Sequence, residues 1–133
     1  MRKFATAVIA ATALLAAPAL LAKPRLTGEE RLAKRLEGRE AGKPQSCLPS
    51  WETRDLEIID GVALVYGHGD TIWVNRPDNA KDLDDDEILV TKTTGSQLCR
   101  LDIVQTMDRT SHFTTGFVGL GDFVPYKKVA KAN

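Results

Sequence analysis

Val62-Ala63-Leu64-Val65-Tyr66-Gly67-His68-Gly69-Asp70-Thr71-Ile72-Trp73-Val74-Asn75 is the stretch of sequence that decides the fold. Its two outer parts, residues 62–66 and 71–75, are short apolar runs of the kind that form strands. The four residues between them include two glycines, which are typical of a turn. The stretch therefore predicts a β-hairpin with a four-residue loop.

Further short strands are predicted along the rest of the chain. The runs with strand-like composition cover residues 51–59, 88–93, 97–107 and 117–124, and residues 76–86 form a polar loop. Thr94-Gly95-Ser96 predicts a second hairpin, which joins 88–93 to 97–107. Two glycines in the last run predict a bent or bulged strand that ends at Pro125-Tyr126. This spacing is typical of an α+β protein, mainly antiparallel β, with a small barrel- or sandwich-like sheet.

One charged helix is predicted before the β-rich part. Thr27 and Glu30 form a capping-box pattern, and residues 29–41 are mostly good helix formers. Gly42 and Pro44 stand where the end of a helix is expected. Because the apolar face is thin, we expect this helix to lie loosely on the domain or to project from it. Acidic residues interleave with its basic ones, which favours a solvated helix over a basic partner-binding strip.

The first residues have the organisation of a secretory signal peptide. Arg2 and Lys3 precede an apolar stretch, and small residues lead to an expected cleavage after Ala22, with Ala17-Pro18-Ala19 as a competing site. The apolar stretch is short for a membrane span. We therefore expect a periplasmic or secreted protein with no membrane span after processing. The predicted segments are 1–22, signal peptide; 23–46, charged helical segment and linker; 47–126, β-rich domain; and 127–133, C-terminal tail.

Cys47 and Cys99 are the only two cysteines of the chain. Because an oxidising compartment favours their pairing, we predict a structural disulfide. Such a bridge closes a loop of roughly fifty residues and adds about 4 kcal/mol in the chain-entropy model. A redox pair or a metal site is less favoured, because the C-x-x-C spacing is absent and no histidine is near either cysteine in sequence.

The charge balance excludes some classes of partner. The chain has 18 basic and 18 acidic residues. Removal of Arg2 and Lys3 with the leader leaves 16 basic and 18 acidic residues. Nucleic-acid binding needs a clustered basic excess, so neither nucleic acid nor an anionic membrane surface is expected as a partner. The partner that we expect is an envelope protein or ligand whose identity the sequence does not reveal.

His68 and Asp70 are the main candidates for catalysis or binding. They share the predicted hairpin loop, and a histidine beside a carboxylate can act as a general base. No G-x-S-x-G motif supplies a nucleophile, and Gly and Asp are common in turns for conformational reasons alone. The interpretation as a turn is therefore favoured over catalysis. His112, in another polar connection, is a weaker candidate.

Asp82, Asp84 and Asp86 are a minor candidate for a metal site. Alternating carboxylates can bind Ca²⁺, which takes six to eight oxygen ligands. The EF-hand register fails, because its sixth position holds Glu87 instead of glycine. A solvated acidic loop that protects a sheet edge is favoured. We therefore expect no metal and no cofactor.

Two further patterns remain open. Arg100 and Asp102 alternate with apolar residues, so on a strand they would share one face, as a polar pair or as the solvated side. The four Trp and Tyr side chains either form part of the core or present a stacking surface for sugar rings. They are Trp51, Tyr66, Trp73 and Tyr126.

Three segments together carry a resemblance to known proteins. They are Ser46-Cys47, the stretch Leu98-Cys99-Arg100-Leu101-Asp102-Ile103 with its preceding Gly95-Ser96-Gln97, and Gly121-Asp122-Phe123-Val124-Pro125-Tyr126. The chain resembles, over residues 47–128, small exported bacterial proteins classified as a domain of unknown function. Members of that group often carry further cysteines, and this chain departs from the pattern, because it has none in those neighbourhoods, where Ala80 and Val118 lie. The resemblance implies export and the extent of the domain, and it implies no activity.

Three functional hypotheses follow from these observations. The leading one is a non-catalytic periplasmic binding or interaction module. The second is a small hydrolase or metal-dependent enzyme that uses His68 and Asp70. The third is an inhibitor of an envelope enzyme, with residues 67–70 as its protruding loop.

Overall fold

The computed structural model describes residues 22–130, and the predicted leader therefore lies outside the described residues apart from Ala22. Within this range there are one α-helix, two short 3₁₀ helices and ten strands, and the strands form three antiparallel sheets. None of the helices in this range has the length and apolar character needed to cross a membrane. Signal-peptide cleavage stays a prediction.

The larger sheet has five strands, and the predicted first hairpin lies in its middle. Its order is β1 (Arg39–Ala41), β10 (Phe123–Lys128), β5 (Thr71–Asn75), β4 (Ala63–Tyr66) and β3 (Leu56–Ile59). Strands β4 and β5 are antiparallel, with Tyr66 opposite Trp73. Gly67 and Gly69, in the loop between them, have φ angles of 82° and 83°, which glycine adopts without strain. The hairpin predicted from 62–75 is confirmed.

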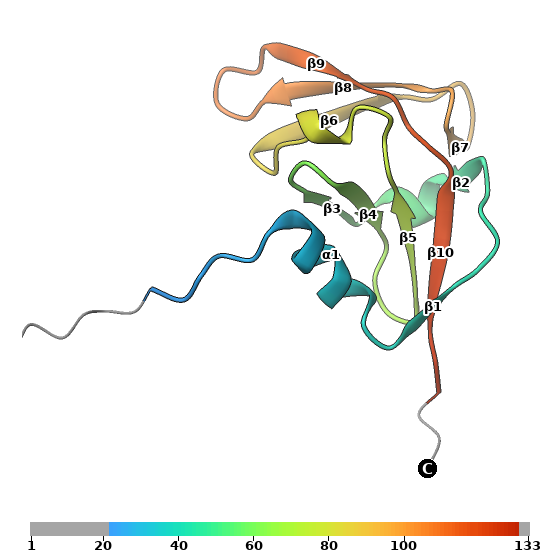
Figure 1. Ribbon diagram of the computed structural model, residues 1–133. Helices are drawn as coiled ribbons and strands as arrows, with labels where there is room; N and C mark the ends of the chain where they lie inside the picture. The colour runs from blue at the N-terminus through green and yellow to red at the C-terminus, as the bar shows by residue number, and fades with distance from the viewer. Residues whose placement is uncertain (1–21, 131–133) are drawn as a thin grey trace, which may run out of the picture.

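Two smaller sheets complete the fold. A three-stranded sheet has the order β6 (Glu87–Lys92), β8 (Ile103–Asp108), β9 (Thr114–Val118), and a two-stranded sheet pairs β2 (Cys47–Pro49) with β7 (Gln97–Cys99). Figure 1 shows the three-stranded sheet lying across the larger one, and α1 packs against the other face of the larger sheet. The sheets do not close into a barrel. The mainly antiparallel β fold is thus confirmed, and it is layered like a sandwich.

Apolar side chains of the larger sheet point alternately to its two faces. One cluster, which includes Leu64, Tyr66 and Phe123, packs between the sheets with Val104 and Val118 from the three-stranded sheet. The second cluster lies under the helix and is formed by Leu32, Ile59, Val62, Ala63, Val65, Ile72 and Val74. All four residues of β4 are buried for this reason. The larger sheet is covered on both faces.

The helix, α1 (Gly28–Leu36), begins as predicted and ends earlier. Thr27 and Glu30 make both halves of the capping box. The helix stops because Gly38 adopts φ 70°, and the next three residues pair with β10 as strand β1. The expectation of a helix to residue 41 is therefore wrong. The expected loose attachment is also wrong, because Leu32 is only 1% exposed and packs on the sheet.

The predicted second hairpin is wrong in its pairing. Strand β6 pairs with β8, whereas β7, which lies between them in sequence, pairs with β2. The Cys47–Cys99 bond holds β7 against β2 and away from β6. Residues 51–59 also divide, into a 3₁₀ helix η1 (Ser50–Thr53) and strand β3. The loop predicted over 76–86 is present and contains the short 3₁₀ helix η2 (Ala80–Asp82).

The last predicted strand is two strands in different sheets. Strand β9 belongs to the three-stranded sheet, and β10 belongs to the larger one. Between them, the side-chain amide of Asn75 accepts from the Gly121 N–H at 2.9 Å and donates to the Gly121 carbonyl at 2.7 Å. Strand β10 also continues through Pro125 to Lys128. The Pro125 carbonyl accepts a hydrogen bond from the Gly42 N–H, just beyond the end of β1. The nitrogen and the carbonyl of a strand residue point to the same side, so the N–H that proline lacks would also point past the end of β1, where no strand partner needs it.

Candidate functional site

The predicted disulfide is present and links the two short strands β2 and β7. The sulfur atoms of Cys47 and Cys99 are 2.05 Å apart, and the two residues lie directly opposite in the register. The hydrogen bond from the Arg100 N–H to the Ser46 carbonyl, at 2.9 Å, makes the cysteines a non-hydrogen-bonded pair. Side chains approach most closely at such positions, which explains why the bridge fits there.

His68 has a carboxylate partner, which is Asp55 and not Asp70. The His68 Nδ1 lies 2.7 Å from an Asp55 carboxylate oxygen, and the histidine side chain is 79% exposed. Asp70 instead lies 3.8 Å from the Lys128 ammonium group. Sequence reasoning missed Asp55 because it precedes β3. The β3–β4 pairing brings it beside the loop, where the Gly67 N–H donates to its carbonyl at 2.8 Å.

The surroundings of His68 offer little for covalent catalysis. A shallow depression of about 360 Å³ beside it is lined by Arg35, Arg54, Asp55, Leu56, Glu57, Val65 and Gly67. Among these described residues there is no hydroxyl or thiol that His68 could activate. Arg35 and Glu57 are paired with each other at 3.0 Å. The dyad can bind or transfer a proton, and it has no protein nucleophile beside it.

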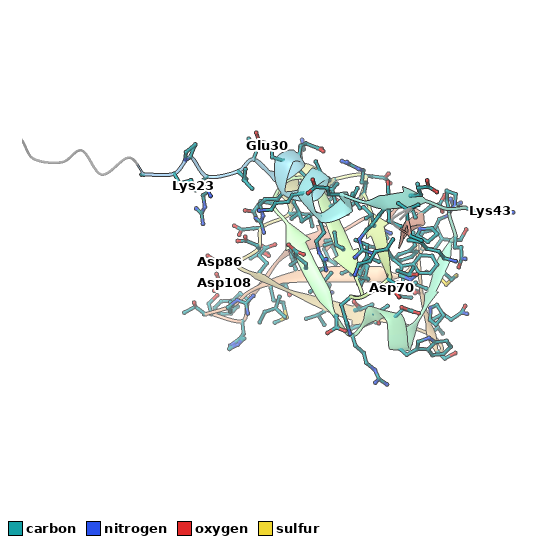
Figure 2. All side chains as sticks on the ribbon, turned by 90° about the horizontal axis from the view of Figure 1, so that it is seen from below. Lys23, Glu30, Lys43, Asp70, Asp86 and Asp108 are labelled. Atoms are coloured by element: carbon teal, nitrogen blue, oxygen red, sulfur yellow. A yellow bond between two sulfur atoms is a disulfide. The ribbon has the colours of Figure 1, made fainter. Side chains whose placement is uncertain are left out.

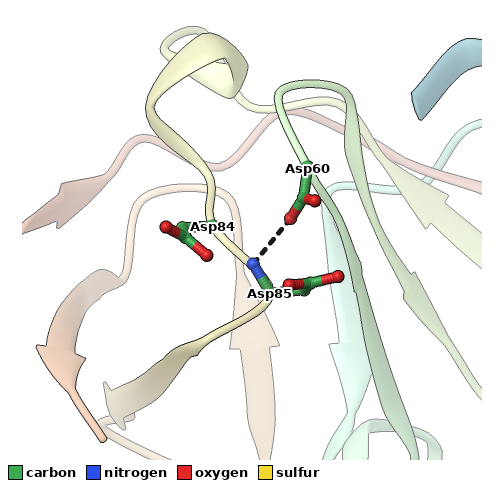
Figure 3. Close-up of side chains that lie close together, drawn as sticks. All are labelled: Asp60, Asp84 and Asp85. Atoms are coloured by element: carbon green, nitrogen blue, oxygen red, sulfur yellow. Dashed lines mark hydrogen bonds between the residues drawn. The ribbon is translucent and has the colours of Figure 1, made fainter. Parts of the chain in front are cut away.

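The acidic loop forms a cluster different from the one predicted. Asp60, Asp84 and Asp85 bring carboxylate oxygens within 4.8 Å of one another, and all three are exposed (Figure 3). An Asp60 carboxylate oxygen accepts from the Asp85 N–H at 2.7 Å. The Arg31 guanidinium lies 3.2 Å from Asp85 and 3.6 Å from Asp60. The positive charge of Arg31 lies against the negative charge of the aspartates. Because Arg31 belongs to α1, these ion pairs connect the helix to the two loops that carry Asp60 and Asp85.

The predicted trio Asp82, Asp84 and Asp86 is not the group that comes together. Asp82 accepts from the Asn79 side chain at 3.4 Å, and an Asp84 carboxylate oxygen accepts from the Asp86 N–H at 2.9 Å. In Figure 2, Asp86 lies beside Asp108 at one end of the molecule, whereas Lys43 lies at the other end. The labelled charges are thus distributed over different sides of the protein.

Asp108 holds a turn through hydrogen bonds to its carboxylate. The backbone and side chain of Ser111 and then the backbone of Thr110 donate to it and lower its pKa. Arg76, hydrogen-bonded at 2.9 Å, lowers the pKa of Glu29. These charges have structural partners in turns and at the helix.

The remaining sequence patterns divide between different parts of the structure. Arg100 and Asp102 lie in the turn after β7, where Asp102 accepts from the Cys99 N–H at 2.7 Å and Arg100 pairs with Asp122 at 3.3 Å. The four Trp and Tyr side chains form no common stacking surface. Tyr66 and Trp73 pack between the sheets, Tyr126 packs on the helix side, and Trp51 is exposed.

The outer face of the three-stranded sheet is largely apolar, with two exposed and three half-buried apolar residues. The register places Ile88, Val90, Ile103, Met107 and Phe117 on this face, together with Gln105 and Lys92. Ile103 is 61% exposed and Phe117 is 60% exposed. The inner face is also apolar, because Val104 and Val118 are buried in the core. We call the five apolar residues the outer patch.

Sequence reasoning missed the outer patch, although a signal for it exists. Ile88-Leu89-Val90 is a run of three apolar residues in one strand, which indicates that both faces of the strand are apolar. A strand of this kind is usually covered on both faces. In the described residues, Ile88 and Val90 on the outer face of β6 are half-buried, and the neighbouring Ile103 and Phe117 are exposed.

Comparison of the chain with protein-family models, with curated proteins and with solved structures gives no match. The fold and the surfaces described above therefore carry the functional argument by themselves. They define a small disulfide-bridged β protein with an exposed apolar sheet face.

Proposed function

We propose that this protein is a non-catalytic interaction module outside the cytoplasm, which binds a protein partner through the outer patch. The observation that carries the proposal is the exposure of Ile103 and Phe117 on a sheet whose opposite face is already in the core. Contiguous exposed apolar patches on soluble proteins commonly mark interaction sites. The signal-like leader and the disulfide, which is compatible with an oxidising compartment, support the location.

The size of the outer patch favours a transient partner over a permanent dimer. Three strands of about six residues cover about 15 Å by about 20 Å, or roughly 300 Å². Stable interfaces bury about 800 Å² on each partner. The occupant that fits is therefore a different protein that contacts this face weakly, with Lys92 as the charged residue at its end.

Photo-crosslinking in the producing cell tests the interaction. A photoreactive phenylalanine analogue at position 117 or 103 is expected to give one adduct of discrete mass with another protein. The same analogue at Trp51, which is 65% exposed but lies outside the patch, is the matched control. Val90→Asp should abolish the adduct formed from position 117. Equal adducts at all three positions, or an adduct with a second copy of the chain, would contradict the proposal.

A small hydrolase remains the second candidate, and the His68–Asp55 contact at 2.7 Å favours it. This dyad would act on a water molecule, because no protein nucleophile lies in the depression beside it. Hydrolysis of ester or phosphoester model substrates that is lost in His68→Ala and in Asp55→Asn would support this candidate. Activity that persists in both variants would exclude it.

A further inference from the structure

A cleft opens between the larger sheet and the three-stranded sheet, near the edges formed by β3 and β6. It has a volume of about 260 Å³. Its lining residues come from η1, β3, β4, β6, β7 and the residue after β6, and they are Ser50, Thr53, Leu56, Tyr66, Leu89, Thr91, Thr93 and Leu98. The volume is slightly below that of pockets for drug-sized ligands, which begin at about 300 Å³.

The lining of the cleft consists of hydroxyl groups and leucines, without a charged side chain among these described residues. Two of the hydroxyl groups already donate to backbone carbonyls, Thr53 to Ser50 at 2.9 Å and Thr93 to Gly95 at 3.2 Å. Their oxygen lone pairs can still accept hydrogen bonds. The cleft therefore offers both donors and acceptors, but no charge.

Tyr66 is the most buried of these hydroxyl-bearing residues. The residue is 3% exposed, and its ring packs edge-on against Phe123 with the centroids 5.9 Å apart. Burial raises the pKa of Tyr66. The hydroxyl therefore stays neutral and available as a donor.

The cleft is the space that the Tyr66 hydroxyl can reach. Among the described residues, Trp73 Nε1 is the one fully enclosed side-chain nitrogen or oxygen without a partner. Tyr66 lines the cleft and its hydroxyl is not such an enclosed atom, so this hydroxyl faces accessible space and can bond to water or to a ligand.

We infer that this cleft binds an uncharged, polyhydroxylated small molecule of about one sugar ring, with the Tyr66 hydroxyl as its innermost donor. Hydroxyl groups of such a ligand would form hydrogen bonds with the Tyr66 hydroxyl and with the Thr and Ser oxygens. The leucines, Leu56, Leu89 and Leu98, would pack against the C–H faces of the ring. An anionic or cationic ligand is disfavoured, because it would lose hydration without an opposite charge in return.

This site is independent of the outer patch. The cleft lies between the sheets, whereas the patch lies on the opposite face of β6, because Leu89 and Thr91 alternate with Ile88 and Val90. A ligand in the cleft and a protein on the outer patch can therefore be present together. Failure of either proposal leaves the other intact.

NMR titration of the oxidised protein tests the inference. The probes are glucose and N-acetylglucosamine, with glucuronate as a charged analogue of the ring and glycerol as a comparison for unspecific polyol effects. We expect saturable shifts for one of the two neutral sugars at Tyr66, Thr91 and Leu98, and weaker binding of glucuronate. Glycerol should give no saturation. The absence of saturable shifts with both neutral sugars would overturn the inference.

Tyr66→Phe separates a binding role from a structural one. Loss of one hydrogen bond should weaken sugar binding about tenfold. The melting temperature should change little, because the variant removes a hydroxyl that faces the cleft and keeps the ring that packs against Phe123. Tyr126→Phe is the matched control, since Tyr126 lies on the opposite face of the larger sheet, and it should leave binding unchanged.

Thr91→Val provides a second variant at the exposed end of the cleft. It keeps the shape of the side chain and removes its hydroxyl, so we expect weaker sugar binding with the fold retained. Binding that neither Tyr66→Phe nor Thr91→Val weakens would contradict the inference, because the ligand would then lie elsewhere.

Discussion

The larger sheet and the three-stranded sheet share one core but differ in how they are covered. In the larger sheet, the four residues of β4 are all buried, because α1 covers one face and the three-stranded sheet covers the other. In the three-stranded sheet, β8 alternates between buried and accessible residues, and Ile103 on its outer face is largely exposed. Both sheets have apolar residues on their two faces, but the larger sheet is covered on both faces and the three-stranded sheet on one.

The difference depends on α1, which has no counterpart over the outer patch in the described residues. Leu32 anchors α1 in the core, and charged pairs surround this contact. Arg31 contacts Asp60 and Asp85, and Arg35 contacts Glu57. Exposed ion pairs of this kind each contribute little to stability. They orient the helix, and the burial of Leu32 provides most of the stabilisation.

The largest effect on stability is expected from removal of the disulfide, which joins β2 to β7. The double variant Cys47→Ser, Cys99→Ser should lower the free energy of unfolding by about 4 kcal/mol, because the bridge closes a loop with a sequence separation of 52. Urea denaturation of the oxidised protein and the variant measures the difference. A loss below about 1 kcal/mol would show that β2 and β7 pair without the bond.

Paired alanine variants on the two sheets test the difference in coverage directly. Leu32→Ala should cost about 3 kcal/mol, because it leaves a cavity between α1 and the larger sheet. Ile103→Ala on the outer patch should cost less than about 0.5 kcal/mol, because this side chain is exposed in the isolated protein. Urea denaturation compares them. Similar losses for both variants would mean that the outer patch is covered within the chain.

A third comparison uses two asparagines that hold the connection between β9 and β10. Asn75 is buried and makes two hydrogen bonds to Gly121, so Asn75→Ala should cost about 2 kcal/mol. Asn79 makes similar bonds to Phe117 and Gly119 near the surface, and Asn79→Ala should cost about 0.5 kcal/mol. Thermal unfolding of both variants gives the ranking, and the reverse order would refute this explanation.

The smallest effect is expected from pH. The backbone and side chain of Thr27 lower the pKa of Glu30 from its usual 4.5, and Ser111 lowers that of Asp108 from its usual 3.8. A carboxyl group with a lowered pKa stabilises the folded state above its unfolded pKa, and this contribution is lost as pH falls through the folded value. The melting temperature should therefore decline below about pH 4.5. Glu30→Gln should flatten the first part of the decline, and an unchanged profile would contradict this assignment.

The candidate sites were less predictable from sequence than the hairpin. His68 was recognisable, but its partner Asp55 is 13 residues away and comes close only through the β3–β4 pairing. The outer patch required the register of three strands. The cleft required the relative position of two sheets, because Tyr66 and Thr91 belong to different layers.

The sequence by itself determined the features that arise within a few residues or from a unique pair. These are the 62–75 hairpin, the Thr27–Glu30 capping box and the Cys47–Cys99 bond. The tertiary structure alone decided that α1 ends at Leu36, that β7 leaves its neighbour β6 for β2, and which apolar face remains exposed. The physical reason is that turns and caps form with partners a few residues away. A strand, in contrast, has several possible partners far away in the sequence, and its pairing depends on which arrangement buries the most apolar surface in the assembled core.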